Sequence, residues 1–179
     1  MKKLCFLFIL FVFVSKINAQ YQPLNLTNCL VAAQLEFQED RFTLEVNLSE
    51  IFANTGIKAI PSLNILKRGA NMDLLASDSL VQIMKSKGID TYVLVSVRGY
   101  DNTFKINPKE ENIINEIEAG HMFPLYRDNI SSVTLEFNFY RNGKFIGNDL
   151  LKLGGIGERD EVIKKLRKKL PKKIKNNWK

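Results

Sequence analysis

The chain has 179 residues, 26 of them basic and 19 acidic, and a formal net charge of +7. Residues 20–161 carry 14 basic and 19 acidic side chains, whereas residues 162–179 carry nine basic side chains and no acidic one. The positive charge therefore belongs to the end of the chain, which excludes a uniformly basic fold.

The first 19 residues have the composition of a secretory signal peptide. Lys2 and Lys3 precede an apolar run of 11 residues, and Ala19 provides a small residue at which cleavage is expected. The run is too short for a membrane core about 30 Å thick, and no second run of spanning length follows. We therefore predict an exported protein, periplasmic or extracellular, whose mature chain has no transmembrane segment.

The 160 residues that cleavage would leave are enough for one domain with a sizeable core. We expect a flexible arm over residues 20–29, an α/β domain over residues 30–170 and a basic tail over residues 171–179. Cys29 is the one cysteine left, so an internal disulfide is excluded. It stands in an apolar run and is interpreted as a buried, inert thiol.

The first half of the domain predicts alternating strands and helices. Leu30–Phe37 reads as a strand, and Arg41–Thr55 fits a helix that Asp40 caps and Gly56 ends. The alternation of apolar residues after Arg41 leaves a strand over residues 41–49 as the alternative, paired in a hairpin with residues 30–37.

A βαβ unit is predicted next. Ile57–Leu66 is expected to be a strand, with Pro61 favouring an edge position or a break near the middle of the strand. A helix opened by Asp73 or Asp78 and closed by Gly88 leads to the apolar strand Thr91–Arg98. A helix between two strands indicates parallel neighbours joined by a right-handed crossover.

The second half predicts a hairpin between two helices. We expect a short helix over residues 108–119, strands over residues 131–140 and 145–153 joined at Asn142-Gly143, and a helix over residues 158–170. Pro171 is expected to end that helix and to leave residues 172–179 frayed. The predicted fold is a single α/β (mixed α+β) domain, in two or three layers, with a mixed sheet of about five strands.

The order of these elements, with the strings Ile57-Lys-Ala-Ile-Pro-Ser62 and Gly88-Ile-Asp-Thr-Tyr-Val-Leu-Val95, resembles small exported bacterial α/β domains. These relatives share the architecture of the TolB amino-terminal domain and of the curli-secretion lipoprotein CsgG, and uncharacterised exported proteins of Bacteroidota are the nearest in kind. The resemblance implies an accessory or binding role in the cell envelope and carries over no catalytic residue. The lipidation cysteine of some relatives is absent.

No motif indicates catalysis, a cofactor or a metal. His121 is the only histidine and lacks a second ligand nearby, and no Gly-x-Ser-x-Gly sequence presents a serine. Three pairs of carboxylates are interpreted as solvated helix faces: Glu110 with Glu111, Glu116 with Glu118, and Asp73 with Asp78. Acidic residues after Gly154-Gly155-Ile156-Gly157 make that loop a turn rather than a phosphate site.

The basic end is the one candidate contact. Its side chains flank the apolar stripe of the last helix and are proposed to meet an anionic surface, unless they only solubilise the chain. The residues are Lys164, Lys165, Arg167, Lys168, Lys169, Lys172 and Lys173. Export argues against nucleic acid as the partner.

We therefore expect an exported, non-enzymatic accessory protein that binds a protein or envelope surface, for instance along an exposed sheet edge. A small carboxylate-dependent hydrolase or lyase, and an anionic-surface binder, are the alternatives.

Overall fold

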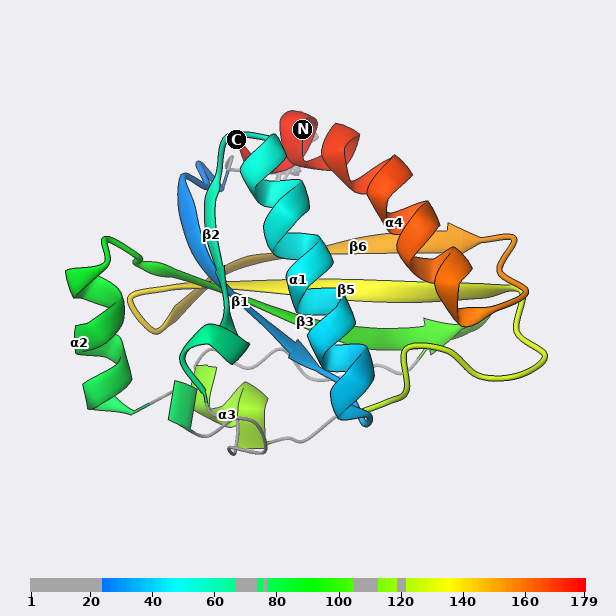
Figure 1. Ribbon diagram of the computed structural model, residues 1–179, viewed down its shortest axis with the longest axis horizontal. Helices are drawn as coiled ribbons and strands as arrows, with labels where there is room; N and C mark the ends of the chain where they lie inside the picture. The colour runs from blue at the N-terminus through cyan, green and yellow to red at the C-terminus, as the bar shows by residue number, and fades with distance from the viewer. Residues whose placement is uncertain (1–23, 67–73, 76, 105–112, 119–121) are drawn as a thin grey trace, which may run out of the picture.

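The computed structural model describes residues 24–66, 74–75, 77–104, 113–118 and 122–179 (Figure 1). The predicted signal peptide and His121 lie outside these residues.

A mixed sheet forms the middle of the molecule. Its main strands run in the order β2-β1-β3-β5-β6, and the short β4 pairs with the end of β3. β1, β2 and β3 are mutually parallel. β5 runs antiparallel to β3, and β6 runs antiparallel to β5 and therefore in the same direction as β3. The strands are β1 (Asn28–Gln34), β2 (Lys58–Pro61), β3 (Thr91–Tyr100), β4 (Thr103–Phe104), β5 (Ser132–Arg141) and β6 (Lys144–Gly154).

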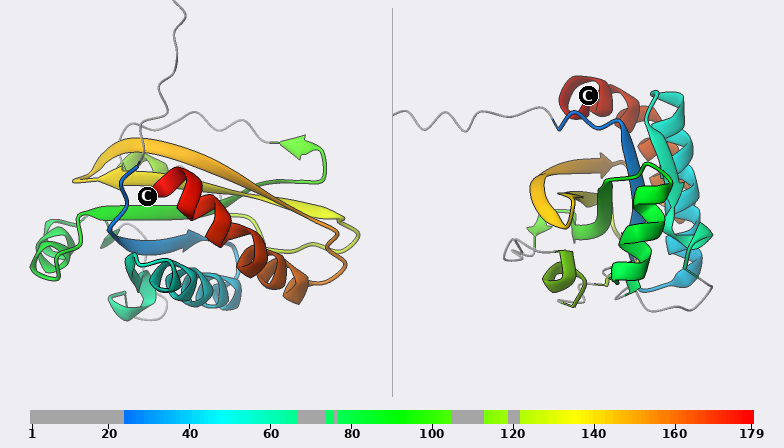
Figure 2. Two further views of the ribbon diagram at one scale, coloured as in Figure 1. Left: turned by 90° about the horizontal axis from the view of Figure 1, so that it is seen from above. Right: turned by 90° about the vertical axis from the view of Figure 1, so that its left-hand side faces the viewer.

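Two helical layers cover the sheet, which confirms the predicted α/β class. The layers are formed by α1 (Gln38–Asn54) with α4 (Arg159–Lys173), and by α2 (Asp78–Ser86) with α3 (Ile113–Glu118). Neighbouring residues of β1 divide between two cores, because Val31 packs with α1 and α4 whereas Leu30 packs with α2 and α3. Figures 1 and 2 show α1 and α4 side by side on one face of the sheet.

The predicted pairing of the second and third strands is wrong in one respect. β2 and β3 run in the same direction, but β1 lies between them and pairs with both. The strand predicted over residues 57–66 also ends early, at Pro61, and continues as a 3₁₀ turn over Ser62–Asn64.

The ambiguous segment after Arg41 is helical. α1 begins one residue after Phe37, which contributes no side-chain cap, so Asp40 lies inside the helix instead of capping it. Gly56 follows the helix with a φ of +78°, a left-handed conformation that glycine adopts without strain.

The hairpin is confirmed. Asn142 and Gly143, with φ of +51° and +78°, form the two-residue turn between β5 and β6.

Both ends of the described chain are packed, unlike the flexible arm and frayed tail expected from the sequence. Leu24 and Leu26 are buried, and the Leu26 amide donates to the carbonyl of Trp178 over 2.7 Å. α4 runs through Pro171 and continues as one π turn over Ile174–Trp178.

Trp178 is the largest of the fully buried side chains. Its ring lies 4.9–5.8 Å from those of Phe52, Phe137 and Phe139, measured between centroids. Its indole Nε1 donates to Asp149 over 2.8 Å, and the ammonium of Lys173 lies 2.8 Å from the same carboxylate. The last turn of the chain therefore belongs to the core.

Replacing Trp178 with Ala is expected to lower the free energy of unfolding by about 3–5 kcal/mol, because it opens a cavity among three aromatic rings. Chemical denaturation followed by circular dichroism measures the change. Asn176→Ala, at an exposed position of the same turn, is the control and should change stability by less than about 0.5 kcal/mol. Equal stability of the two variants would indicate that the end of the chain is frayed and not part of the core.

Candidate functional site

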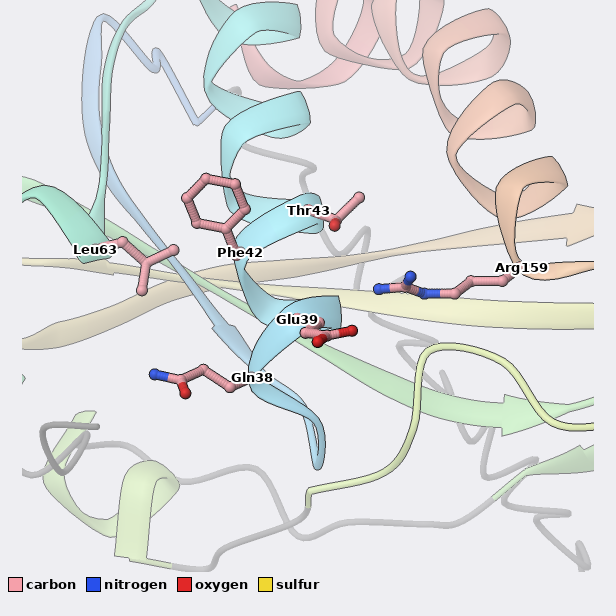
Figure 3. A pocket seen from close by; sticks show the side chains of 6 residues that line it. All are labelled: Gln38, Glu39, Phe42, Thr43, Leu63 and Arg159. Atoms are coloured by element: carbon pink, nitrogen blue, oxygen red, sulfur yellow. The ribbon is translucent and has the colours of Figure 1, made fainter. Parts of the chain in front are cut away.

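A pocket of about 490 Å³ lies at the start of α1. Figure 3 shows Phe42 and Leu63 beside one another on one side of α1, with Arg159 extending toward the start of α1 from the first turn of α4 on the other side. Its lining is Gln38, Glu39, Phe42, Thr43, Leu63 and Arg159.

Exposed apolar side chains also stand near this pocket, because Val46 is one helical turn beyond Phe42, and Phe37, just before α1, lines a neighbouring pocket with Glu39 and Arg159. Phe42 is 58% exposed, Phe37 is 54% exposed and Val46 is 40% exposed. Large apolar side chains grouped in this way are typical of a binding surface, whereas single ones are ordinary. We call the pocket together with Phe37 and Val46 the α1 groove.

A buried carboxylate fixes one wall of the α1 groove. Glu45 is fully buried and accepts hydrogen bonds from the Ala33 amide at 2.9 Å, from the Ser62 hydroxyl at 2.8 Å and from the Leu63 amide at 3.1 Å. The guanidinium of Arg41 lies 3.0 Å away and balances the charge. Glu45 thus ties α1 to β1 and to the turn after β2, and it holds Leu63 beside Phe42.

A second buried carboxylate fixes the other wall. Asp40 accepts a hydrogen bond from Arg159 Nε on one oxygen and from the Leu125 amide, at 3.2 Å, on the other. Arg159 Nη2 is buried and has no hydrogen-bond partner in the described part of the chain. A buried donor without an acceptor costs free energy, so the position of this guanidinium depends on the hydrogen bond from its Nε to Asp40.

Residues 123–124 cross the crevice at the carboxyl ends of the parallel strands. In open α/β sheets this crevice is the usual ligand site. Here Leu35 forms a bridge with Phe123, the Glu36 amide donates to the Phe123 carbonyl at 3.2 Å, and the Tyr100 hydroxyl donates to the Pro124 carbonyl. Beside this segment a pocket of about 290 Å³ remains, and Tyr100, Phe123 and Arg127 are among the residues that line it.

Several polar residues lie buried on the sheet face that α2 and α3 cover. Glu136 pairs with Arg98 at 3.3 Å and accepts from Asn148 at 3.0 Å, and Asn138 donates to Glu116 at 3.1 Å. Alternation in β5 predicted one apolar face and did not show that the polar face would be covered. The bonds within this network join strands to each other and to α3, which is a structural role.

The sequence-predicted basic residues do not share one environment. Arg167 contacts Glu50 at 2.5 Å, Lys169 donates to the Lys152 carbonyl at 3.0 Å, and Lys173 pairs with Asp149. Lys164, Lys168 and Lys172 are exposed on the outer side of α4, whereas Lys165 is only partly exposed.

The remaining predicted features divide between described and undescribed residues. Cys29 is fully buried, and burial raises the pKa of its thiol, as expected of an inert cysteine. The amide of Gly157 donates to Glu161 over 2.6 Å, so a carboxylate of the chain itself occupies the amide that a bound phosphate would need in this loop. Of the carboxylates interpreted as solvated, Asp73, Glu110 and Glu111 lie outside the described residues. The interpretation is wrong for Glu116, which is buried where α3 packs on the sheet and accepts a hydrogen bond from Asn138.

In the described part of the chain, no group of three or more His, Cys, Asp or Glu side chains could hold a metal ion. None of the described helices has the length and apolar character of a membrane span.

No protein family and no curated protein matches the chain. Its structure is similar to that of lipoprotein GNA1162 from Neisseria meningitidis, with 11% identity, a TM-score of 0.45, and coverage of 86% of this chain and 99% of that one. It is also similar to PelC from Paraburkholderia phytofirmans, whose crystals contain a dodecamer, with 11% identity, a TM-score of 0.44, and coverage of 84% and 89%. Nothing about binding or activity follows from likeness at this level.

Glu45→Gln is expected to lower the free energy of unfolding by about 3 kcal/mol. The neutral amide leaves Arg41 without its counter-charge, and the NH₂ group of the glutamine faces backbone amides that are themselves donors. Urea denaturation measures the loss. Glu50→Gln removes an exposed carboxylate from the same helix and should cost far less. Equal losses would show that the Glu45 contacts do not hold the groove.

Tyr100 should ionise late, because burial raises its pKa to about 12. Since the neutral phenol is favoured in the folded chain, its contribution to stability is complete below pH ~10, the usual tyrosine pKa, and is lost as the pH rises from ~10 to 12. The absorbance titration of the wild type minus that of Tyr100→Phe isolates this group. An inflection near pH 10 in that difference would contradict the packing of Tyr100 against residues 123–124.

Proposed function

We propose that this chain is an exported, non-enzymatic binding protein, and that the α1 groove takes an apolar side chain of a partner protein. The observation that supports it is the exposure of Phe42 in this pocket, with Val46 one helical turn further along α1 and Phe37 in the neighbouring pocket that shares Glu39 and Arg159. Complete burial of one phenylalanine contributes about 1.5–3 kcal/mol, so covering this patch is a substantial driving force.

The extent of the patch favours a protein over a small ligand. A volume of about 490 Å³ suits either an anchoring side chain or a small molecule. A small molecule within it would leave Phe37 and Val46 in water, whereas a protein surface would cover them as well. Aromatic side chains are also enriched at the centres of protein interfaces.

The polar rim supplies direction. Arg159 Nη2 lacks an acceptor, and Gln38 and Thr43 line the same pocket. A backbone carbonyl or a carboxylate of the partner, placed beside its apolar side chain, would meet these donors. The predicted occupant is therefore a peptide segment with an apolar anchor next to an acceptor.

The sheet edges are less suited to this role. β2 is four residues long and ends in Pro61, which has no amide hydrogen to pair. β6 is longer, but Lys144 and Lys152 stand on it and a bulge breaks its register beside Tyr140, which are common protections against strand pairing.

A carboxylate-dependent hydrolase or lyase is the weaker alternative. Both oxygens of Asp40 and both oxygens of Glu136 already have protein partners. General acid and base catalysis requires a carboxylate free to exchange its proton with a substrate.

An envelope role accords with the predicted signal sequence and with the element order that resembles the TolB amino-terminal domain and CsgG.

Selection of peptides from a displayed library of random 12-residue sequences tests the proposal. The exported protein should enrich peptides with an aromatic or aliphatic anchor, and Phe42→Asp should weaken their binding at least about tenfold, as loss of an interface anchor does. Because Phe42 is mostly exposed, this variant should keep its stability within about 0.5 kcal/mol.

Ile83→Asp is the matched control, since Ile83 is also an exposed apolar residue but lies on α2. It should bind the selected peptides as the wild type does. Failure to enrich any peptide, or equal weakening by both substitutions, would contradict the proposal.

A further inference from the structure

The basic residues of the last helix form two groups with different environments. Arg167, Lys169 and Lys173 contact groups of the chain itself. Four exposed lysines have no carboxylate within 4.0 Å among the described residues: Lys164, Lys168, Lys172 and Lys175. We call these four the lysine row.

The lysine row lies along one side of the helix. Its members are separated by four, four and three residues, which places them on the same helical face. At 1.5 Å per residue the row is about 16 Å long. It faces away from the core, because Val162, Leu166 and Leu170 are buried on the opposite side.

The helix dipole does not account for this arrangement. Cations are stabilised only in the last turn of a helix, and α4 runs from Arg159 to Lys173. Lys164 and Lys168 lie in the first two-thirds of α4, where the dipole gives them no such benefit. Like charges four residues apart also repel each other, so the row opposes the stability of its own helix.

The row is held rigidly and acts through charge alone. Trp178 anchors the end of the chain, so the four ammonium groups are presented on a fixed frame. The same burial removes the one aromatic ring of this segment from any contact surface. Single-stranded nucleic acid is recognised by aromatic stacking together with charge, whereas an anionic bilayer attracts lysines without it.

We propose that the lysine row docks the protein on an anionic phospholipid bilayer. The occupant is a plane of negative charge, which complements a straight, uncompensated row of positive charge. This contact is independent of the α1 groove, since the two surfaces have no residue in common.

Sedimentation with lipid vesicles tests this inference, using protein expressed from the full chain and purified after export. Phosphatidylcholine vesicles with about 30% phosphatidylglycerol should bind it at ~20 mM salt and release it at ~500 mM, because salt shortens the range of surface charges. Replacing all four lysines of the row with Gln should reduce the partition coefficient more than about tenfold, given about fivefold for each lysine at the surface.

A second variant with four exposed lysines elsewhere replaced by Gln (Lys58, Lys85, Lys87 and Lys144) has the same net charge and should stay within about threefold of the wild type. Replacing the row with Arg should retain binding, and circular dichroism should show every variant folded. Absence of binding at low salt would overturn the proposal, as would equal binding to pure phosphatidylcholine, binding that salt does not weaken, or equal loss in both Gln variants.

Discussion

The buried carboxylate of Glu45 is the contact on which the surrounding architecture depends. Its oxygens accept from the Ala33 amide in β1 and the Leu63 amide after β2, so helix and sheet are joined at a point where apolar packing alone would allow sliding. β2 ends where the chain turns to reach this carboxylate, through Ser62. The short strand, the position of Leu63 and the outward direction of Phe42 follow from that one requirement.

Glu45 also explains why the sequence left α1 ambiguous. Helical periodicity is recognised when apolar residues share one face, but here Asp40 and Glu45 are buried while Phe42 and Val46 are exposed. Buried acidic residues and exposed apolar residues both weaken the periodic signal. The buried acidic residues fix the two walls of the α1 groove, and the exposed apolar residues form its surface. Departures from local sequence rules are expected at functional or constrained sites, so the ambiguity was itself informative.

Features fixed by neighbouring residues could be predicted, whereas those fixed across the sheet could not. The Asn142-Gly143 turn sets the β5–β6 hairpin locally, but the position of β1 between β2 and β3 depends on which way each crossover runs. The packed end was predictable in principle: Val162 and Leu170 belong to a series of apolar residues at every fourth position that ends at Trp178. The concentration of lysines and Pro171 obscured that series.

The two proposed contact surfaces lie along different parts of the same helical layer. The α1 groove is at the start of α1, where Arg159 begins α4, and the lysine row runs from Lys164 toward the opposite end of α4. The ion pair of Arg167 with Glu50 joins the two helices between them, and the hydrogen bond from Arg167 lowers the pKa of Glu50. Because Arg167 is engaged with α1, the positive charge left for an external surface is confined to the outer side of α4.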